Sequence, residues 1–226
     1  MPQGRFRFEG DLSRFLLPSE RGRETVRSWG DTDTIMHVIE AIGVPHTEVD
    51  RIEQNGDLIC VFPRLLDRTP NPRFALDQHL GRLAAYLRML GFDTLYSNDC
   101  DDDVLAAISA RERRILLSRD VGLLKRGNVC YGAFVHATAP EAQLVEISRR
   151  FDLAAALDPF ARCIRCNGPL IPVPREDILD RLPPRVREQY DEFRRCASCD
   201  QVYWRGTHFQ RMARLVERLR QSTGGA

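Results

Sequence analysis

Apolar and polar residues follow three different patterns along the chain, and the first covers residues 1–68. Residues here alternate as in strands and then recur as in a helix that Asp31 or Asp33 can cap and Gly43 ends. The expected elements are a strand, its hairpin partner, a helix and a strand entered through an Asn-Gly turn, at residues 5–9, 12–17, 33–43 and 54–63. This order predicts a small α+β domain.

The second pattern, over residues 72–160, alternates short apolar runs with helical periodicity. Its clearest helix ends at Gly91 and has apolar residues at positions 80, 83, 84, 87 and 90. Strands are expected at residues 73–77, 93–97, 114–118 and 129–137, and helices at 79–91, 101–112 and 140–151. Such alternation predicts an α/β domain with a parallel sheet flanked by helices, whose functional groups gather at the carboxyl ends of the strands.

The best linker in the chain is LDRTPNP, at residues 66–72, because two prolines and an asparagine break any regular element. A third pattern begins at residue 161, where prolines and paired cysteines replace apolar periodicity. Residues 208–221 then have the periodicity of a closing helix. We therefore expect a third domain over residues 161–226.

The strongest motif that spacing alone provides is a double Cys-x-x-Cys, made of Cys163, Cys166, Cys196 and Cys199. Two residues between the cysteines of a pair let both thiolates reach one ion from a tight turn, and two such turns complete a tetrahedron. The alternatives are disulfides or free thiols. We predict a structural zinc ion, with the 29 intervening residues holding an insertion. A closed site of this kind supplies folding energy and does not identify the chemistry.

Charge is distributed unevenly, although the formal net charge is only +1. Residues 161–226 carry 13 basic and 8 acidic residues, and of the 33 basic residues in the chain only Lys125 is a lysine. Guanidinium groups bind phosphate bidentately, so this region is either a polyanion-binding surface or a solvated basic face. No apolar run is long enough to span a membrane or to form a signal core, which favours a soluble cytoplasmic protein.

Aspartates stand where strands of the second domain are expected to end. Asp77 follows the apolar run RFAL, Asp120 follows ILLSR, and residues 101–103 are all aspartates that open a helix. If the strands are neighbours, these carboxylates converge at one edge of the sheet, where a cation must offset their repulsion. Oxygen ligands suit magnesium or manganese, and such a site supports metal-assisted hydrolysis of phosphodiesters. Taken alone, each aspartate also fits a helix or turn cap.

Several stretches together resemble the Mut-seven C-terminal RNase family, which joins a PIN-like nuclease domain to a zinc ribbon. They span about residues 72–212 and read LDQHLGRLAAYLRMLGFDT, SNDCDDDVLAAI, RRILLSRDVGLLKR, CIRCNGPLIPV and FRRCASCDQVYWRGTHFQRM. The order of elements in residues 1–68 is similar to that of the ubiquitin-like β-grasp domain, which bacterial members of the family carry at this place.

The resemblance implies a metal-dependent ribonuclease on a PIN-like fold, with magnesium or manganese at its site. By motif, Asp77 is the carboxylate of the first strand, Asp101 or Asp102 that of the helix, and Asp120 that of the Ser-Arg-Asp motif. These residues would hold one or two divalent ions. The candidate contacts to RNA are Arg82, Arg88, Arg119, Lys125 and His208.

Two features qualify this site. Arg82 and Arg88 are six residues apart, which does not place them on one helix face, so we expect at most one of them to point at the site. Lys125 stands where many PIN nucleases have a fourth acidic residue, which weakens the prediction of a full two-metal site. In the zinc ribbon, Tyr203 and Trp204 fit either stacking on an unpaired base or packing against the cysteines.

Three functions are compatible with the sequence. The first is an RNA endonuclease, with tRNA or another structured RNA as substrate. The second is a non-catalytic RNA- or ribosome-binding protein, and the third places the main role in the N-terminal domain. That domain runs on into LLDRTPNPRF instead of ending in a free Gly-Gly, so docking of a partner protein fits it better than a carrier role. The joint presence of Asp77, Asp101 and Asp120 favours the first function.

Overall fold

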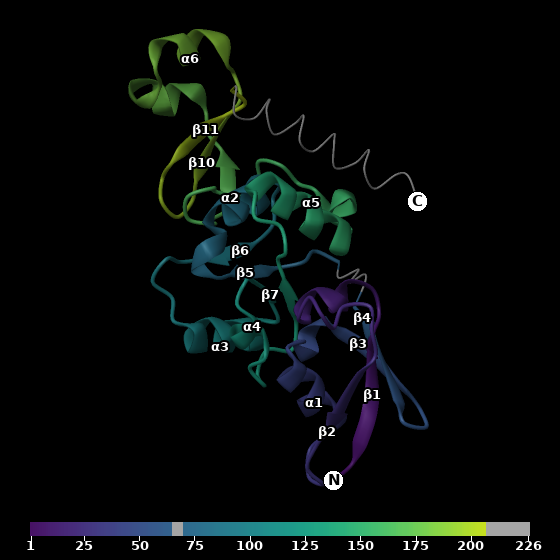
Figure 1. The fold of residues 1–226 in the computed structure, drawn as a ribbon. Helices are drawn as coiled ribbons and strands as arrows, with labels where there is room; N and C mark the ends of the chain where they lie inside the picture. The colour runs from purple at the N-terminus through teal and green to yellow at the C-terminus, as the bar shows by residue number, and fades with distance from the viewer. Residues whose placement is uncertain (65–69, 207–226) are drawn as a thin grey trace. The chain divides into compact units, whose positions relative to one another are not determined.

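The computed structural model describes residues 1–64 and 70–206; residues 65–69 and 207–226 lie outside the description (Figure 1). The chain divides into two compact units. The first consists of Met1–Asp67, Ala75–His79 and Ser97–His136, and the second of Arg68–Phe74, Leu80–Tyr96 and Ala137–Ala226. The N-terminal domain thus shares a unit with part of residues 72–160. The domain boundaries at residues 68, 72 and 160 remain predictions.

The first unit begins with a four-stranded sheet of order β2-β1-β4-β3. Its elements are β1 (Gln3–Phe8), η1 (Gly10–Phe15), β2 (Thr25–Ser28), α1 (Ile35–Ile42), η2 (His46–Glu48), β3 (Val49–Asn55) and β4 (Leu58–Pro63). Strand β1 pairs antiparallel with β2 and parallel with β4. The core joins helix to sheet, since Ile39 of α1 is buried with Phe6 and Ile59. This α+β arrangement is the ubiquitin-like domain that the order of elements predicted.

The predicted hairpin partner at residues 12–17 is wrong. Gly10–Phe15 is a 3-10 helix, and β1 pairs with β2 instead. Leu12 and Leu16 are both buried. Leu12 lies within the 3-10 helix and Leu16 is its extended C-cap residue, so a short apolar run does not by itself distinguish a strand from such a turn.

Helix α1 ends at Gly43 as predicted, with φ of 132°, but its N-cap differs from the prediction. The cap is Thr34, whose side chain accepts a hydrogen bond from the amide of His37. Asp33 instead accepts the amide of Gly30 over 2.8 Å. Threonine and aspartate both cap helices well, so the sequence did not distinguish between neighbouring candidates.

The α/β region contains a sheet of order β6-β5-β7-β8. Its strands are β5 (Phe74–Leu76), β6 (Thr94–Tyr96), β7 (Ile115–Ser118) and β8 (Gly132–Phe134), and the adjoining helices are η3 (Gln78–Leu80), α2 (Gly81–Met89), α3 (Asp102–Glu112), α4 (Val121–Leu124), α5 (Pro140–Arg150) and η4 (Leu153–Ala156). Every strand and helix predicted for residues 72–160 is present. Strands β7 and β8 pair in parallel, and β7 is buried throughout, as a strand covered on both faces must be.

The turn after α2 depends on a glycine. Gly91 has φ of 100°, and a Cβ atom there would lie 2.1 Å from the carbonyl oxygen of Asp158. A larger residue would therefore be strained and would also collide with backbone. The glycine that ends the predicted helix is thus required by packing as well as by the turn.

The C-terminal region forms a small antiparallel sheet of order β11-β10-β9. Its elements are β9 (Leu170–Pro172), η5 (Arg175–Arg181), α6 (Pro184–Gln189), β10 (Phe193–Cys196) and β11 (Val202–Trp204). The insertion between the cysteine pairs has its own core, in which Ile178 packs with Leu182 and Phe193. The helix predicted at residues 208–221 lies outside the described residues. Within the described chain, no helix has the length and apolar character needed to cross a membrane.

Candidate nuclease site and metal centre

Asp77 lies directly after β5, and its side chain is only 5% exposed. Its Oδ2 accepts hydrogen bonds from Ser118 Oγ at 2.5 Å and from the amide of Arg119 at 3.1 Å. Its Oδ1 accepts the amide of His79 at 2.9 Å, which confirms the capping role considered from the sequence. A buried carboxylate is tolerated only when such donors replace water. Three donors therefore fix the Asp77 side chain in one position.

Ser118, the last residue of β7, connects Asp77 with Asp120. Its side chain is fully buried, its hydroxyl donates to Asp77 Oδ2, and its Oγ accepts the amide of Asp120 at 2.8 Å. One hydroxyl thus holds two of the predicted acidic residues in register. Sequence reasoning missed this role, although the signal was present: Ser118 is the polar residue that ends an otherwise apolar strand.

Asp120 is the N-cap of α4. Its Oδ1 accepts the amides of Gly122 at 2.6 Å and Leu123 at 3.4 Å. Among the described residues, Oδ2 has no hydrogen-bond partner, and the side chain is exposed. The carboxylate therefore caps the helix with one oxygen and leaves the other available.

Three consecutive aspartates at the start of α3 differ in their partners. Arg126 lies 4.0 Å from Asp102 Oδ2 and also pairs with Asp103. Asp101 occupies the N-cap position without a side-chain cap bond, and in the described part of the chain its carboxylate has no ion pair. Burial, together with the charges of Asp101 and Asp102, raises the pKa of Cys100. Asp101 is thus the member whose carboxylate is free to take a ligand.

In the described part of the chain, no group of three or more carboxylates comes to metal-ligand spacing. Among the described residues, the group of His, Cys, Asp or Glu side chains that meets this spacing is the four cysteines. The acidic residues occupy the ends of β5 and β7 and the start of α3, as predicted. They do not form a closed cluster.

Arg119 and Lys125, both predicted to contact RNA, bind backbone carbonyls. Arg119 Nη1 donates to the carbonyl oxygens of Val135 at 2.9 Å and His136 at 3.1 Å. Lys125 Nζ donates to the carbonyl oxygen of Glu40 in the ubiquitin-like domain. Both side chains therefore stabilise the fold through hydrogen bonds to backbone carbonyls. His208, the remaining candidate of this kind, lies outside the described residues.

The two arginines of α2 differ as their spacing predicted. Arg82 is exposed, whereas Arg88 is buried. Arg88 donates to the carbonyl oxygen of Thr94 at 2.9 Å and to those of Ile164 and Arg165, both at 3.1 Å. The last two carbonyls belong to the first Cys-x-x-Cys turn. Burial lowers the pKa of Arg88, and the nearby Cys163 and Cys166 oppose this effect. Arg88 therefore joins helix α2 to the cysteine site.

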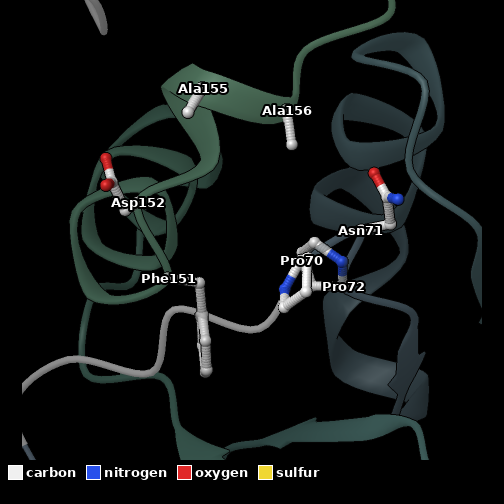
Figure 2. Close-up of a pocket in the computed structure, with 7 residues that line it drawn as sticks. All are labelled: Pro70, Asn71, Pro72, Phe151, Asp152, Ala155 and Ala156. Carbon is white, nitrogen blue, oxygen red and sulfur yellow. The ribbon is translucent and has the colours of Figure 1, made fainter.

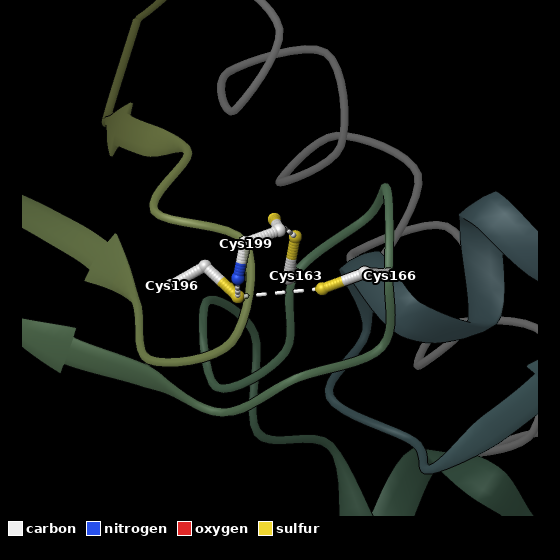
Figure 3. A group of neighbouring side chains, drawn as sticks. All are labelled: Cys163, Cys166, Cys196 and Cys199. Atoms are coloured by element: carbon white, nitrogen blue, oxygen red, sulfur yellow. Dashed lines mark hydrogen bonds between the residues drawn. The ribbon is translucent and has the colours of Figure 1, made fainter.

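The sulfur atoms of Cys163, Cys166, Cys196 and Cys199 all lie within 4.8 Å of one another (Figure 3). The Cys163–Cys199 and Cys166–Cys196 sulfur pairs are 3.6 and 3.4 Å apart. A tetrahedral site with Zn–S bonds of about 2.3 Å requires S–S distances of about 3.8 Å. The predicted metal-binding geometry is therefore present, and the donor set fits zinc.

The four thiols differ in acidity. Burial opposes ionisation of Cys196, but the amides of Cys199 and Ser198 lower its pKa to about 7. Burial raises the pKa of Cys166 to about 12. The hydroxyl of Tyr203 lies 3.0 Å from Cys163 Sγ, so this aromatic residue packs against the cysteines, as one of the two sequence interpretations had it. A cation at the centre would favour all four thiolates together.

Asn167, directly after the first cysteine pair, is a second residue that sequence reasoning missed. Its Oδ1 accepts the amide of Thr94 at 2.9 Å, and its Nδ2 donates to Asp93 Oδ1 at 2.7 Å. Asp93 also accepts from Arg73 at 3.3 Å. Asp93 therefore has a structural role in the turn after α2. Together with Arg88, these contacts join the cysteine turn to β6.

A cavity of about 380 Å³ lies in the second unit (Figure 2). Its lining is mostly apolar and consists of Pro70, Asn71, Pro72, Phe151, Asp152, Ala155 and Ala156. None of the predicted catalytic, RNA-binding or metal-ligating residues is among them. The cavity therefore adds nothing to the predicted site.

Comparison with known protein families gives two matches. The model of the Mut7-C RNAse domain matches residues 72–216, and that of the Mut7-C ubiquitin domain matches residues 1–64. A nuclease-like role is the function that the first match indicates. Searches of curated proteins and of solved structures found no significant match.

Proposed function

Because the chain belongs to the Mut7-C RNAse domain family, we propose that it is a metal-dependent ribonuclease that hydrolyses RNA phosphodiester bonds. The observation that supports this most directly is the Ser118 bridge. It links the Asp77 carboxylate, at 2.5 Å, with the backbone amide of Asp120, at 2.8 Å, so that the segments carrying these two acidic residues are joined at the end of β7. Capping alone does not require such a connection.

The proposed ligands of a magnesium or manganese ion are Asp101 and Asp120. Both are exposed, and each has a carboxylate oxygen without a partner in the described part of the chain. Bound there, the ion would lower the pKa of a water and offset charge on the phosphate. Asp77 is proposed to position the site without binding the ion. Three donors hold its carboxylate, and Ser118 connects that carboxylate to the backbone amide of Asp120. Asp102 is a weaker candidate, since it faces Arg126.

RNA contact is proposed for the exposed arginines of the second unit. Arg82 on α2 and Arg165 in the first cysteine turn are exposed, and guanidinium groups bind phosphate bidentately. Other ribbon arginines are paired with acids, such as Arg181 with Asp200 at 2.7 Å and Arg205 with Glu192 at 3.1 Å. We propose a structured RNA such as tRNA as substrate, because a chain that contains both a zinc ribbon and a nuclease domain suits recognition of shape.

The four cysteines are proposed to bind a structural zinc ion. All four protein ligands are cysteines, which leaves no open position for a substrate. The role of the zinc ion would be to hold the first cysteine turn, which Arg88 joins to α2 and Asn167 joins to β6. The zinc site and the carboxylate site therefore have separate tasks.

The test is RNA cleavage by the purified full-length protein. Total RNA and tRNA are incubated with manganese, with magnesium or with EDTA, beside the variant Asp120→Asn. Asparagine also caps helices well, so this variant removes the charge and keeps α4 intact. We expect metal-dependent cleavage that the variant lacks at unchanged thermal stability.

Two results would contradict the proposal. Equal fragments from wild type and variant would assign the cleavage to a contaminant or to another site. Binding of RNA by both proteins with a steep salt dependence, but without cleavage, would favour the alternative of a non-catalytic RNA- or ribosome-binding protein.

A further inference from the structure

The ubiquitin-like domain, residues 1–64, contacts the segment that follows Asp120, and the contacting residues all belong to the first compact unit. Glu48 at the end of η2 accepts the amide of Phe134 through Oε1 at 2.6 Å. The ring of Phe15 packs edge-on against that of Phe134, with centroids 5.3 Å apart. Strand β8 is the last strand of its sheet, so the Glu48 carboxylate satisfies an amide on a sheet edge.

The burial of Glu48 makes this contact specific. Its side chain is only 5% exposed, and a carboxylate removed from water is costly unless donors replace its hydration. Hydrogen bonds to an ionised acceptor are about twice as strong as those between neutral groups. A chance contact between two surfaces would leave this carboxylate in water.

A second set of contacts reaches helix α4 and the loop after it. Lys125, which follows α4, donates to the carbonyl oxygen of Glu40. The ring of His46 lies between Glu40 Oε1, at 2.7 Å, and the carbonyl oxygen of Val129, at 2.8 Å. The backbone of Gly132 also lies close to the Thr47 side chain, because a Cβ atom on Gly132 would lie 3.2 Å from Thr47 Cγ2. Contacts from α1 and η2 thus extend along the whole stretch from residue 125 to 134.

Helix α4 and the residues that follow β8 both contact the loop of residues 118–120. Helix α4 is the helix that Asp120 caps. The carbonyls of Val135 and His136, directly after β8, accept the Arg119 guanidinium, while the Arg119 amide donates to Asp77. A force that holds α4 and β8 therefore also restrains the loop between Ser118 and Asp120.

We propose that the ubiquitin-like domain is an intramolecular clamp on α4 and β8, with Glu48 as the positioning residue. In this role, its η2 face is occupied by the nuclease part of the same chain and does not serve as a docking site for a partner protein. The clamp is a property of the fold of the first unit and does not depend on which reaction the aspartates support.

The test is amide hydrogen exchange on the full-length protein, comparing Glu48→Ala with Glu53→Ala. Glu53 is an exposed glutamate of the same domain that pairs with Arg51, so it controls for loss of a carboxylate. We expect Glu48→Ala to raise exchange about tenfold or more at residues 118–124 and 129–136, as loss of a hydrogen bond to a charged group implies. Glu53→Ala should leave both segments unchanged. Glu48→Gln keeps an acceptor and should restore most of the protection.

Three outcomes would overturn the clamp. Glu48→Ala could match Glu53→Ala, it could raise exchange evenly over the whole chain, or Glu48→Gln could exchange as fast as Glu48→Ala. If Glu48→Ala does not fold, Lys125→Met provides the second measurement. Faster exchange confined to α4 and the loop after it supports the clamp, and unchanged exchange there contradicts it.

Discussion

The hydroxyl of Ser118 donates a hydrogen bond to Asp77 Oδ2 over 2.5 Å, in a position that solvent does not reach. The same oxygen accepts the amide of Asp120. The positions of Asp77 and Asp120 therefore depend on Ser118, an uncharged residue that is not one of the proposed metal ligands. This dependence can be measured.

Ser118→Ala should lower both stability and RNA cleavage. The change leaves the Asp120 amide and a buried carboxylate oxygen each without one partner, which costs about 1–3 kcal/mol in the free energy of unfolding. Misplacement of the acidic residues should also reduce kcat by up to about 100-fold. Urea unfolding and single-turnover cleavage measure the two effects.

Ser109→Ala is the matched control. Ser109 in α3 is equally buried, and its hydroxyl donates to the carbonyl oxygen of Arg114 at 2.7 Å. We expect a similar loss of stability with cleavage retained under conditions where the protein is folded. Equal loss of cleavage in both variants would mean that Ser118 acts only through stability.

Asp101→Asn and Asp103→Asn should differ strongly in metal-dependent cleavage. Among the residues that the structure describes, the Asp101 carboxylate has no partner, whereas Asp103 pairs with Arg126. Loss of a proposed ligand should cost more than the roughly 10–100-fold that follows loss of a residue supporting a ligand. Manganese titrations of cleavage rate measure the effect, and similar rates for the two variants would remove Asp101 from the proposed site.

Arg88→Met and Arg82→Met separate a structural arginine from a candidate RNA contact. Removing the buried guanidinium leaves three carbonyl groups without their donor, so Arg88→Met should lower the free energy of unfolding by about 2–4 kcal/mol and speed zinc release to a chelator. Arg82→Met should leave stability unchanged and weaken RNA binding. A loss of stability in Arg82→Met together with a loss of RNA binding alone in Arg88→Met would contradict this assignment.

Cys196→Ser should abolish the metal centre. Loss of one of four ligands should leave the purified protein without stoichiometric zinc and should expose the amides of β9, β10 and β11 to exchange, because the metal supplies folding energy. Cys130→Ser is the control, since Cys130 is exposed and lies outside the cysteine group. Metal analysis measures the zinc content of the two variants, and amide exchange measures the protection of their strands. Zinc retained at the wild-type level in Cys196→Ser would contradict a four-cysteine site.

Rules that concern residues close together in the sequence were sufficient to predict many of the helices, strands and motifs of this protein. The alternation of strands and helices over residues 72–160, the glycine turn at Gly91 after α2 and the cysteine pairs each depend on neighbours in the chain. The period of hydrophobic residues, the conformation of a glycine and the spacing of metal ligands are set by residues close together in the sequence. Predictions that rest on them therefore agree with the structure. The failure at residues 12–17 has the same origin, because a short apolar run fits a strand and a 3-10 turn equally well.

Only the tertiary structure decided which polar residues meet. Spacing indicated that Arg82 and Arg88 differ, but not that Arg88 would bind the carbonyls of Ile164 and Arg165, some 76 residues away. Ser118, although it begins the Ser-Arg-Asp motif, and Glu48 were not candidates from the sequence, and their contacts appear once β5, β7 and β8 are assembled. Buried hydrogen bonds join residues that are distant in the chain, and their partners are set by packing of the core. The sequence by itself therefore determined the elements and the candidate ligands, and the fold determined how these residues hold one another in place.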